Sequence, residues 1–322
     1  PYTIESYWRC LLKREFVLNA EPFFIGGSMK KLYGVITAMT TPFTQDNKVD
    51  VAALEEQTEF LIQKGIHCLY PCGTTGEMFS MSAEERELVA ETVVKKAAGR
   101  VTVFVHVGAM CQDCTIRLAK HAHSIGADGV GIITPVFFHV DDRAMVEYYK
   151  TVCAALPDDF PVYVYVIPQL AHNDIGAATM EEIASACKNV VGVKYSFADM
   201  RRINEYLQVR GGNFSVVPGA DDLFLPALSC GCDGTVSGCS GPFPEAFVDV
   251  YKAFQSGDIA AARKAQVKAT KLAMIMKCGA NMSIFKNILT MRGIRGGYMR
   301  RPLLDLTAEQ VAELKKEVAS YL

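Results

Sequence analysis

Between residue 34 and about residue 242, short runs rich in β-branched residues alternate with segments of helical periodicity. The runs lie at 35–41, 68–72, 101–107, 129–134, 162–166, 191–195, 215–218 and 234–237. The segments between them have apolar residues three or four positions apart, as helices covering a sheet require, for example 51–64, 83–98, 115–125 and 142–156. Eight such units in succession predict an α/β fold, a (β/α)8 TIM barrel.

The strand pattern stops after residue 242, and the remaining chain has helical periodicity at 245–255, 259–277, 282–291 and 308–321. Thr307, followed by Glu309 and Gln310, is a plausible start for the last helix. We therefore expect a barrel core over 30–242, and a last barrel helix plus a C-terminal helical extension over 243–322. A doubly wound open sheet is the rival fold. No GxGxxG sequence follows the first strand and no phosphate-binding GxxxxGK[ST] loop occurs, which disfavours that fold and nucleotide cofactors.

Residues 1–28 are set apart from this pattern. Their apolar stretch is interrupted by Glu21 and Pro22, and no clear cleavage site of small residues follows, so a secretory signal is not expected. Met29 begins a segment that resembles a natural start. We interpret residues 1–28 as a leader or an over-extended start, outside the barrel.

Charge and hydropathy exclude two classes of partner. The chain has 33 Lys and Arg against 35 Asp and Glu, with no long basic run, so binding of nucleic acid has little electrostatic support. The one basic, glycine-rich segment, 292–301, is expected to be a solvated turn. No apolar run approaches the roughly 20 residues that span a bilayer, so no membrane partner is expected.

The 11 cysteines are an odd number, scattered through apolar segments. This distribution is more typical of reduced, buried thiols than of a disulfide framework, and it favours a cytoplasmic protein. Cys111 and Cys114 have CxxC spacing. A zinc or redox role would require a second ligand pair or a thioredoxin-like unit around them, and neither is evident, so we expect no metal site.

In a barrel, the active site is built where the strands end. The second strand is followed by Gly73-Thr74-Thr75-Gly76-Glu77, whose hydroxyls and backbone amides could hold a small carboxylate. The alternative is a tight turn in which the threonines satisfy local backbone groups. The sixth strand places Lys194 in an otherwise apolar run. Such a lysine either reaches solvent or faces a desolvated pocket, where a lowered pKa frees its amine to form a Schiff base with a carbonyl.

Two further strand ends carry candidate groups. Tyr165, near the end of the fifth strand, could transfer a proton to a bound carbonyl compound, whereas Tyr163 fits aromatic packing inside the barrel better. The seventh strand ends in Gly219-Ala220-Asp221-Asp222. The two carboxylates could accept hydrogen bonds from substrate hydroxyls, or they could cap the following helix.

Taken together, Gly73–Glu77, the Tyr-Val-Ile-Pro sequence from Tyr165, the Gly-Val-Lys sequence ending at Lys194, and Gly234–Gly238 resemble the dihydrodipicolinate synthase and N-acetylneuraminate lyase family. The resemblance covers about 30–320. It implies a (β/α)8 barrel, usually a homotetramer, that binds pyruvate as a Schiff base on Lys194 without a metal or separate cofactor. It further implies that Thr74 and Thr75 hold the carboxylate of the 2-oxo acid and that Tyr165 transfers protons.

Several residues indicate whether the chain is more similar to the synthase branch or to the lyase branch of this family. The synthase branch has an arginine where this chain has Leu170, and both branches normally have a tyrosine where this chain has Phe137. The lyase branch resembles this chain in His106, Leu170, Ser196 and the acidic pair Asp221-Asp222. Together with Gly219 and Gly238, these positions are the expected substrate contacts: Thr75, Phe137, Leu170, Ser196, Gly219, Asp221, Asp222 and Gly238.

The expected activity is cleavage of a 2-oxo-3-deoxy sugar acid, such as N-acetylneuraminate or 2-keto-3-deoxygluconate, to pyruvate and an aldehyde. The alternatives are dihydrodipicolinate synthesis and dehydration of a sugar acid through the same imine. A catalytically idle ligand-binding barrel is the alternative from a different class, because Phe137 cannot relay a proton.

Overall fold

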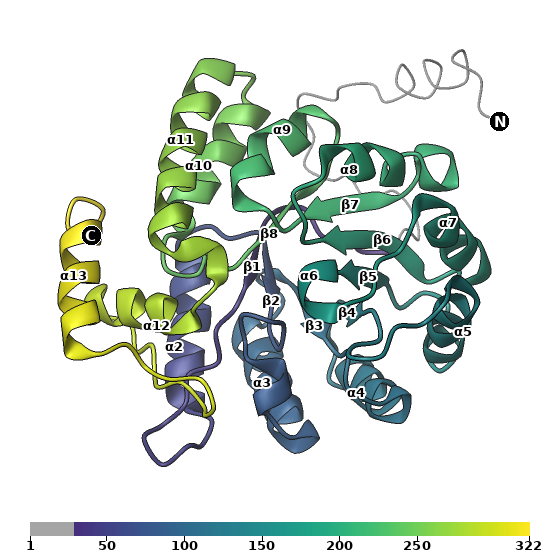
Figure 1. Ribbon diagram of the computed structural model, residues 1–322, viewed down its shortest axis with the longest axis horizontal. Coiled ribbons are helices and arrows are strands. Elements are labelled where there is room, and N and C mark those ends of the chain that lie inside the picture. The colour runs from purple at the N-terminus through teal and green to yellow at the C-terminus, as the bar shows by residue number, and fades with distance from the viewer. Residues whose placement is uncertain (1–28) are drawn as a thin grey trace.

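The computed structural model describes residues 29–322, and the prediction of a leader over 1–28 lies outside this range. Eight parallel strands form one sheet in the order β7-β6-β5-β4-β3-β2-β1-β8 (Figure 1). Their bounds are β1 Gly34–Ala38, β2 Cys68–Tyr70, β3 Thr102–His106, β4 Gly129–Ile133, β5 Val162–Val166, β6 Val190–Tyr195, β7 Ser215–Pro218 and β8 Gly234–Ser237.

Strands β7 and β8 bring the sheet back onto itself. The Asp233 N–H donates to the Val216 carbonyl at 3.1 Å, and the Thr235 hydroxyl donates to the Pro218 carbonyl at 3.1 Å. The sheet is thereby a nearly closed barrel. The predicted (β/α)8 fold is confirmed.

Helices follow the strands and cover the outside of the barrel (Figure 1). Several begin at a polar side chain that caps them, as at α3, where the Ser82 hydroxyl accepts the Glu85 N–H and the Glu85 carboxylate accepts the Ser82 N–H. The barrel helices are α2 Val51–Gln63, α3 Ala83–Ala97, α4 Gln112–Ser124, α5 Asp142–Cys153, α6 Pro168–Ala171, α7 Ala177–Ala186, α8 Met200–Tyr206, α9 Phe224–Ser229 and α10 Pro244–Gln255.

The C-terminal extension consists of α11 Ile259–Ile275, α12 Met282–Met291 and α13 Ala308–Val318. Thr307 caps α13 in a capping box with Gln310, at the predicted start. Figure 1 shows these helices on the side of the barrel where α2 and α10 lie. The boundary expected at residue 242 between core and extension stays a prediction.

The barrel interior is filled by large side chains that need small partners. Tyr70 and Tyr163 are fully buried there with Phe104. The Tyr163 hydroxyl donates to the Ser215 hydroxyl at 2.7 Å and accepts the Leu32 N–H at 3.0 Å, so Tyr163 packs within the core as expected. A β-carbon at Gly131 would lie 1.7 Å from the Tyr70 hydroxyl. Only glycine at residue 131 leaves room for that ring.

Segment 292–301 is the predicted solvated turn only in part: Gly293, Arg295 and Arg301 are exposed, whereas other residues of it are held by ion pairs. Arg300 is buried and forms two bonds to the Glu85 carboxylate, at 2.6 and 2.8 Å, while Arg292 pairs with Glu245 at 2.6 Å. The buried part was not predicted, because the carboxylates that pair with it come from α3 and α10, and the composition of the segment does not reveal such partners.

The prediction that the cysteines are reduced is wrong for one pair. Cys111 and Cys114 form a disulfide at the beginning of α4. The other eight described cysteines are free, and most of them are buried, as expected. Within residues 29–322, no helix is long and apolar enough to cross a bilayer, and no three His, Cys, Asp or Glu side chains gather as metal ligands.

Candidate active site

Lys194 is placed inside the barrel, near the end of β6. Its side chain is 3% exposed. The amine nitrogen lies 3.9 Å from the ring centre of Tyr165 and 4.5 Å from that of Tyr70. The lysine therefore faces the interior of the barrel mouth and does not reach solvent along the strand, which was the alternative.

Burial changes the acid–base behaviour of this amine. Desolvation lowers the pKa of Lys194 from 10.5 to about 7, because the charged form loses its hydration. About half of the amine is then neutral at pH 7, against roughly one part in 3,000 for an ordinary lysine. A neutral amine is the form that attacks a carbonyl.

Tyr165 lies beside Lys194 because β5 and β6 pair with these two residues in register. Its hydroxyl forms a hydrogen bond of 3.0 Å with the Thr74 hydroxyl. Burial raises the pKa of Tyr165, and hydrogen bonds with Thr74 and Ser196 oppose that rise. The phenol therefore holds its proton at neutral pH and has a hydroxyl partner through which to exchange it.

The loop after β2 carries Thr74 and Thr75 to the same end of the barrel. Thr75 lies against Gly238, where a β-carbon would come within 2.9 Å of the threonine hydroxyl. The Thr41 hydroxyl donates a hydrogen bond of 2.8 Å to the Gly76 carbonyl, which fixes the position of this loop. The Thr74 hydroxyl thus reaches Tyr165 at 3.0 Å, and the role of Thr74 and Thr75 in holding a carboxylate stays a prediction.

The end of β7 contributes a partly buried acid. Gly219 packs closely against Ser196. A β-carbon on residue 219 would lie 2.1 Å from the Ser196 hydroxyl oxygen. One carboxylate oxygen of Asp221, Oδ1, is buried without a hydrogen-bond partner in the described structure. Burial raises the pKa of Asp221 to about 6, although hydrogen bonds with Cys239 and Ser237 oppose the rise. Asp222 is exposed.

Phe137 and Leu170 lie at the rim. Their side chains are 73% and 56% exposed, so neither packs around Lys194 in this chain alone. Phe137 has φ +75°, a left-handed conformation that is unusual for a residue with a side chain. The Asn173 amide holds its loop by donating to the Pro135 and Phe138 carbonyls, each at 2.8 Å.

Sequence patterns missed Tyr70 and Arg86. The Tyr70 ring lies under the Lys194 amine, and the Tyr70 hydroxyl is buried without a hydrogen-bond partner in the described structure. Arg86 reaches from α3 to donate to the carbonyls of His106 and Gly108, at 2.8 and 2.9 Å. Tyr70 stands three residues before Gly73 inside an apolar strand, and Arg86 lies in a charged helix, so neither position carried a signal.

His106, which the resemblance singled out, lies in the same cluster. Its Nδ1 donates to the Cys72 carbonyl at 2.9 Å, and its ring meets that of Tyr165 edge-on at 5.7 Å. Burial, together with the charges of Arg86 and Lys194, holds the pKa of His106 well below its ordinary value. The imidazole is therefore neutral beside the lysine.

Comparison with known proteins identifies the family. The model of the dihydrodipicolinate synthetase family matches residues 31–321. The chain is 32% identical to the 4-hydroxy-tetrahydrodipicolinate synthase of Aquifex aeolicus, over 89% of this chain and 97% of the relative. It is 30% identical to the N-acetylneuraminate lyase of Mediterraneibacter gnavus, over 92% of this chain and 94% of the relative.

Solved structures agree with the sequence matches. The dihydrodipicolinate synthase of Aquifex aeolicus superimposes with a TM-score of 0.85, at 32% identity, over 90% of this chain and 98% of that structure. A prophage protein of the same family from Escherichia coli K12, solved in complex with pyruvate, has a TM-score of 0.85 at 26% identity, over 90% and 99% of the two chains. The chain therefore belongs to the dihydrodipicolinate synthetase family and is a carbon–carbon lyase of the pyruvate-dependent class.

Proposed function

We propose that this protein is a Schiff-base-forming class I aldolase that cleaves a 2-oxo-3-deoxy sugar acid to pyruvate and an aldehyde. The observation that carries the proposal is the buried Lys194 amine, with its pKa lowered to about 7, in contact with the Tyr165 ring. The Escherichia coli relative solved with pyruvate supports the choice of 2-oxo acid. The reaction would need no separate cofactor, because the imine between Lys194 and the 2-oxo acid accepts the electron pair of the bond that breaks.

The reaction begins with attack of the neutral amine on the carbonyl carbon of the substrate. A C–N bond forms, the carbonyl oxygen leaves as water, and the nitrogen becomes a protonated imine. In this site, Thr74, Thr75 and the loop amides would hold the carboxylate of the 2-oxo acid. Desolvation around Lys194 supplies the neutral amine without help from a neighbouring base.

The protonated imine then accepts the electron pair of the carbon–carbon bond that breaks. The substrate hydroxyl next to that bond loses its proton as it becomes the aldehyde carbonyl, and Tyr165 is placed to pass that proton on through Thr74. The enamine left on Lys194 is protonated at carbon 3, and hydrolysis releases pyruvate. Tyr165 must exchange protons in both directions, which its hydroxyl partner permits.

The proposed substrate class rests on the polar groups beyond the imine. Ser196 and the buried Asp221 oxygen are suited to hydrogen-bond a polyhydroxylated tail, of N-acetylneuraminate or 2-keto-3-deoxygluconate type. Leu170 offers no guanidinium for a second carboxylate. The Aquifex aeolicus relative favours a second candidate, synthesis of 4-hydroxy-tetrahydrodipicolinate, and Leu170 is the residue that argues against it.

Borohydride reduction in the presence of pyruvate tests the imine. We expect a mass increase on the peptide containing Lys194, and none in Lys194→Arg. An unmodified lysine would overturn the proposal and favour the idle barrel. Pyruvate release from sialic acid, 2-keto-3-deoxygluconate and 4-hydroxy-2-oxoglutarate, with aspartate semialdehyde condensation measured alongside, then identifies the reaction. Water loss without pyruvate would identify a dehydratase.

We further propose that the protein assembles as a homotetramer. The family resemblance supports this assembly. Light scattering after size-exclusion chromatography measures the mass directly, and a monomeric mass of 35.3 kDa would overturn it.

A further inference from the structure

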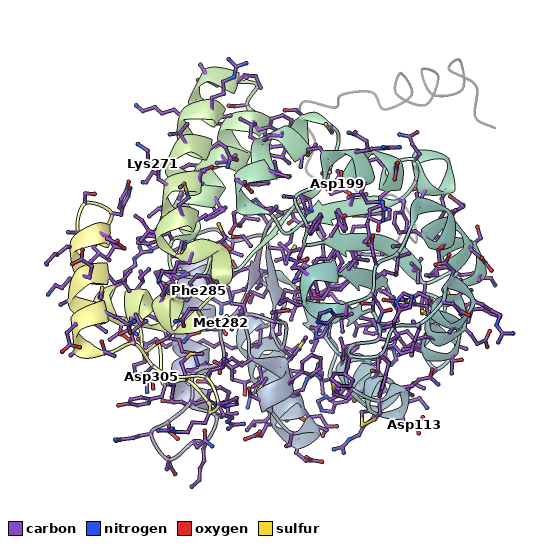
Figure 2. The ribbon with its side chains drawn as sticks, viewed as in Figure 1. Asp113, Asp199, Lys271, Met282, Phe285 and Asp305 are labelled. Atoms are coloured by element: carbon purple, nitrogen blue, oxygen red, sulfur yellow. A yellow bond between two sulfur atoms is a disulfide. The ribbon has the colours of Figure 1, made fainter. Side chains whose placement is uncertain are left out.

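The disulfide between Cys111 and Cys114 lies on the exposed surface, at the beginning of α4. Both cysteines are exposed. Figure 2 shows Asp113, one of the two residues between them, at the outer edge of the molecule. A thiol from solution can therefore reach these sulfur atoms.

Cys111 occupies the N-cap of the 13-residue helix α4, and its sulfur accepts the Cys114 N–H at 3.3 Å. When the disulfide opens, this N–H and the positive end of the helix dipole stabilise a Cys111 thiolate, while the Asp113 carboxylate in the first turn opposes it. A stabilised thiolate is both a good leaving group and the species that re-forms the disulfide.

Among the other described cysteines, Cys187 has a pKa lowered by its hydrogen bond with Cys153, but it is buried and therefore out of reach of a thiol in solution. Burial raises the pKa of Cys68 to about 12 and that of Cys72 to about 11. Cys278 is exposed, but burial and the charges of Asp221 and Asp222 raise its pKa. Cys278 is therefore a matched internal control: an accessible thiol without a helix N-terminus.

The loop that leads to the disulfide also leads to the active site. It leaves β3 at His106, whose ring contacts Tyr165, and passes Gly108, whose carbonyl accepts Arg86. The Ala109 N–H donates to the Thr115 hydroxyl at 3.0 Å, and that hydroxyl donates to the Cys111 carbonyl at 3.2 Å. Opening the disulfide removes a covalent restraint at the end of this loop.

We propose that Cys111 and Cys114 are a thiol–disulfide exchange site whose oxidation state acts, through the β3–α4 loop, on the turnover of the lyase. The reductant is a low-molecular-weight thiol or a dithiol protein. Its thiolate attacks one sulfur and releases the other as a cysteine thiolate. A second thiolate then breaks the mixed disulfide, so that two thiols are oxidised to one disulfide and the protein gains two hydrogens.

The chemical part of the proposal is tested without substrate. The folded protein is equilibrated in glutathione redox buffers, the free thiols are trapped with an alkylating agent, and the peptides are weighed. We expect reversible gain of two alkyl groups on the peptide holding both cysteines, and alkylation of Cys111 at pH 7 about tenfold faster than that of Cys278. A pair that opens only after denaturation, or that reacts no faster than Cys278, overturns the proposal.

The functional part is tested by turnover of oxidised and reduced enzyme. We expect about a twofold or larger difference in kcat for the unaltered protein, retained in Cys278→Ser and absent in Cys111→Ser/Cys114→Ser. Serine is a good N-cap residue, so the double variant keeps the start of α4. Equal turnover in both states, or a redox response that survives in the double variant, overturns control of the active site. The activity arm relies on the proposed lyase function, whereas the mass measurement does not.

Discussion

Glu77 and Lys286 form a fully buried ion pair between the loop after β2 and helix α12, with 2.5 Å between Lys286 Nζ and Glu77 Oε1. Lys286 also donates to the Tyr298 carbonyl at 2.7 Å, and the second Glu77 oxygen accepts the Arg300 N–H at 3.2 Å. Glu77 lies two residues after Thr75 in the same loop and has φ +57°. The C-terminal extension therefore holds the loop that is proposed to bind the substrate carboxylate.

Breaking this pair is expected to be costly. Lys286→Met leaves the Glu77 carboxylate buried without its cation, which should lower the free energy of unfolding by about 3–5 kcal/mol in urea titrations. The double variant Glu77→Gln/Lys286→Met removes both charges and should recover part of that loss, and it should bind pyruvate more tightly than the single variant. The exposed pair of Lys316 with Glu313 is the control, and Lys316→Met should change little. Equal losses for both lysines would contradict the assignment.

Lys194 should reduce stability at neutral pH. Its pKa falls from 10.5 to about 7 in the folded chain, so the stability that the neutral amine contributes is present above about pH 10.5 and is lost as the pH falls through about 7. Lys194→Met should therefore be more stable than the unaltered protein at pH 7, by a few kcal/mol, and the gap should close toward pH 10. Unfolding titrations across this range measure it; a gap independent of pH would contradict the lowered pKa.

The same pKa governs imine formation. The rate of borohydride trapping with pyruvate, corrected for the reagent's own pH dependence, should rise as the pH passes through about 7 and then level off. A rise centred near 10 would show that the amine keeps the pKa of an exposed lysine.

Tyr165→Phe should separate imine formation from proton transfer. Exchange of the pyruvate methyl hydrogens with deuterated water, followed by NMR, should slow by about a hundredfold or more, while trapping of Lys194 changes little. Tyr163→Phe is the matched control. That hydroxyl bonds to Ser215 away from the amine, so its loss should affect stability and leave exchange intact. Unchanged exchange in Tyr165→Phe would remove its proposed role.

Asp221→Asn should weaken binding of the sugar tail. We expect a higher KM for the sugar acid and unchanged exchange with pyruvate alone, because the tail is absent from pyruvate. The pKa of Asp221 is raised from 3.8 to about 6, so its favourable contribution to stability is present below about pH 3.8 and is lost as the pH rises through 6. The variant should thus be the more stable protein at pH 7. Asp222→Asn, at an exposed site, is the control, and equal KM changes in both would contradict a specific contact.

Much of the barrel could be predicted because its signals are local. Strand β5 was predicted at 162–166 and is Val162–Val166, and α12 was predicted at 282–291 and is Met282–Met291. The spacing of hydrophobic residues and the capping residues determine such elements, and both can be recognised within a short stretch of sequence. The short helix α6 was not predicted, since four residues carry no periodicity.

The placement of Lys194 and Tyr165 at strand ends followed from the order of strands and the barrel rule alone. Their contact, and the Tyr165–Thr74 hydrogen bond, required the register of β5 against β6 and the return of the loop after β2. Tyr70 and Arg86 could not have been assigned to the site, because their neighbours come from other strands and helices.

Spacing along the chain was enough to predict the eightfold alternation, most helix ends and the residue types from which a Schiff-base site can be built. The folded arrangement was needed to show that Lys194 loses its hydration, that Glu77 pairs with Lys286 from 209 positions away, and that Phe137 and Leu170 are exposed. Burial and ion pairing depend on distances in space, and residues far apart in the sequence provide them.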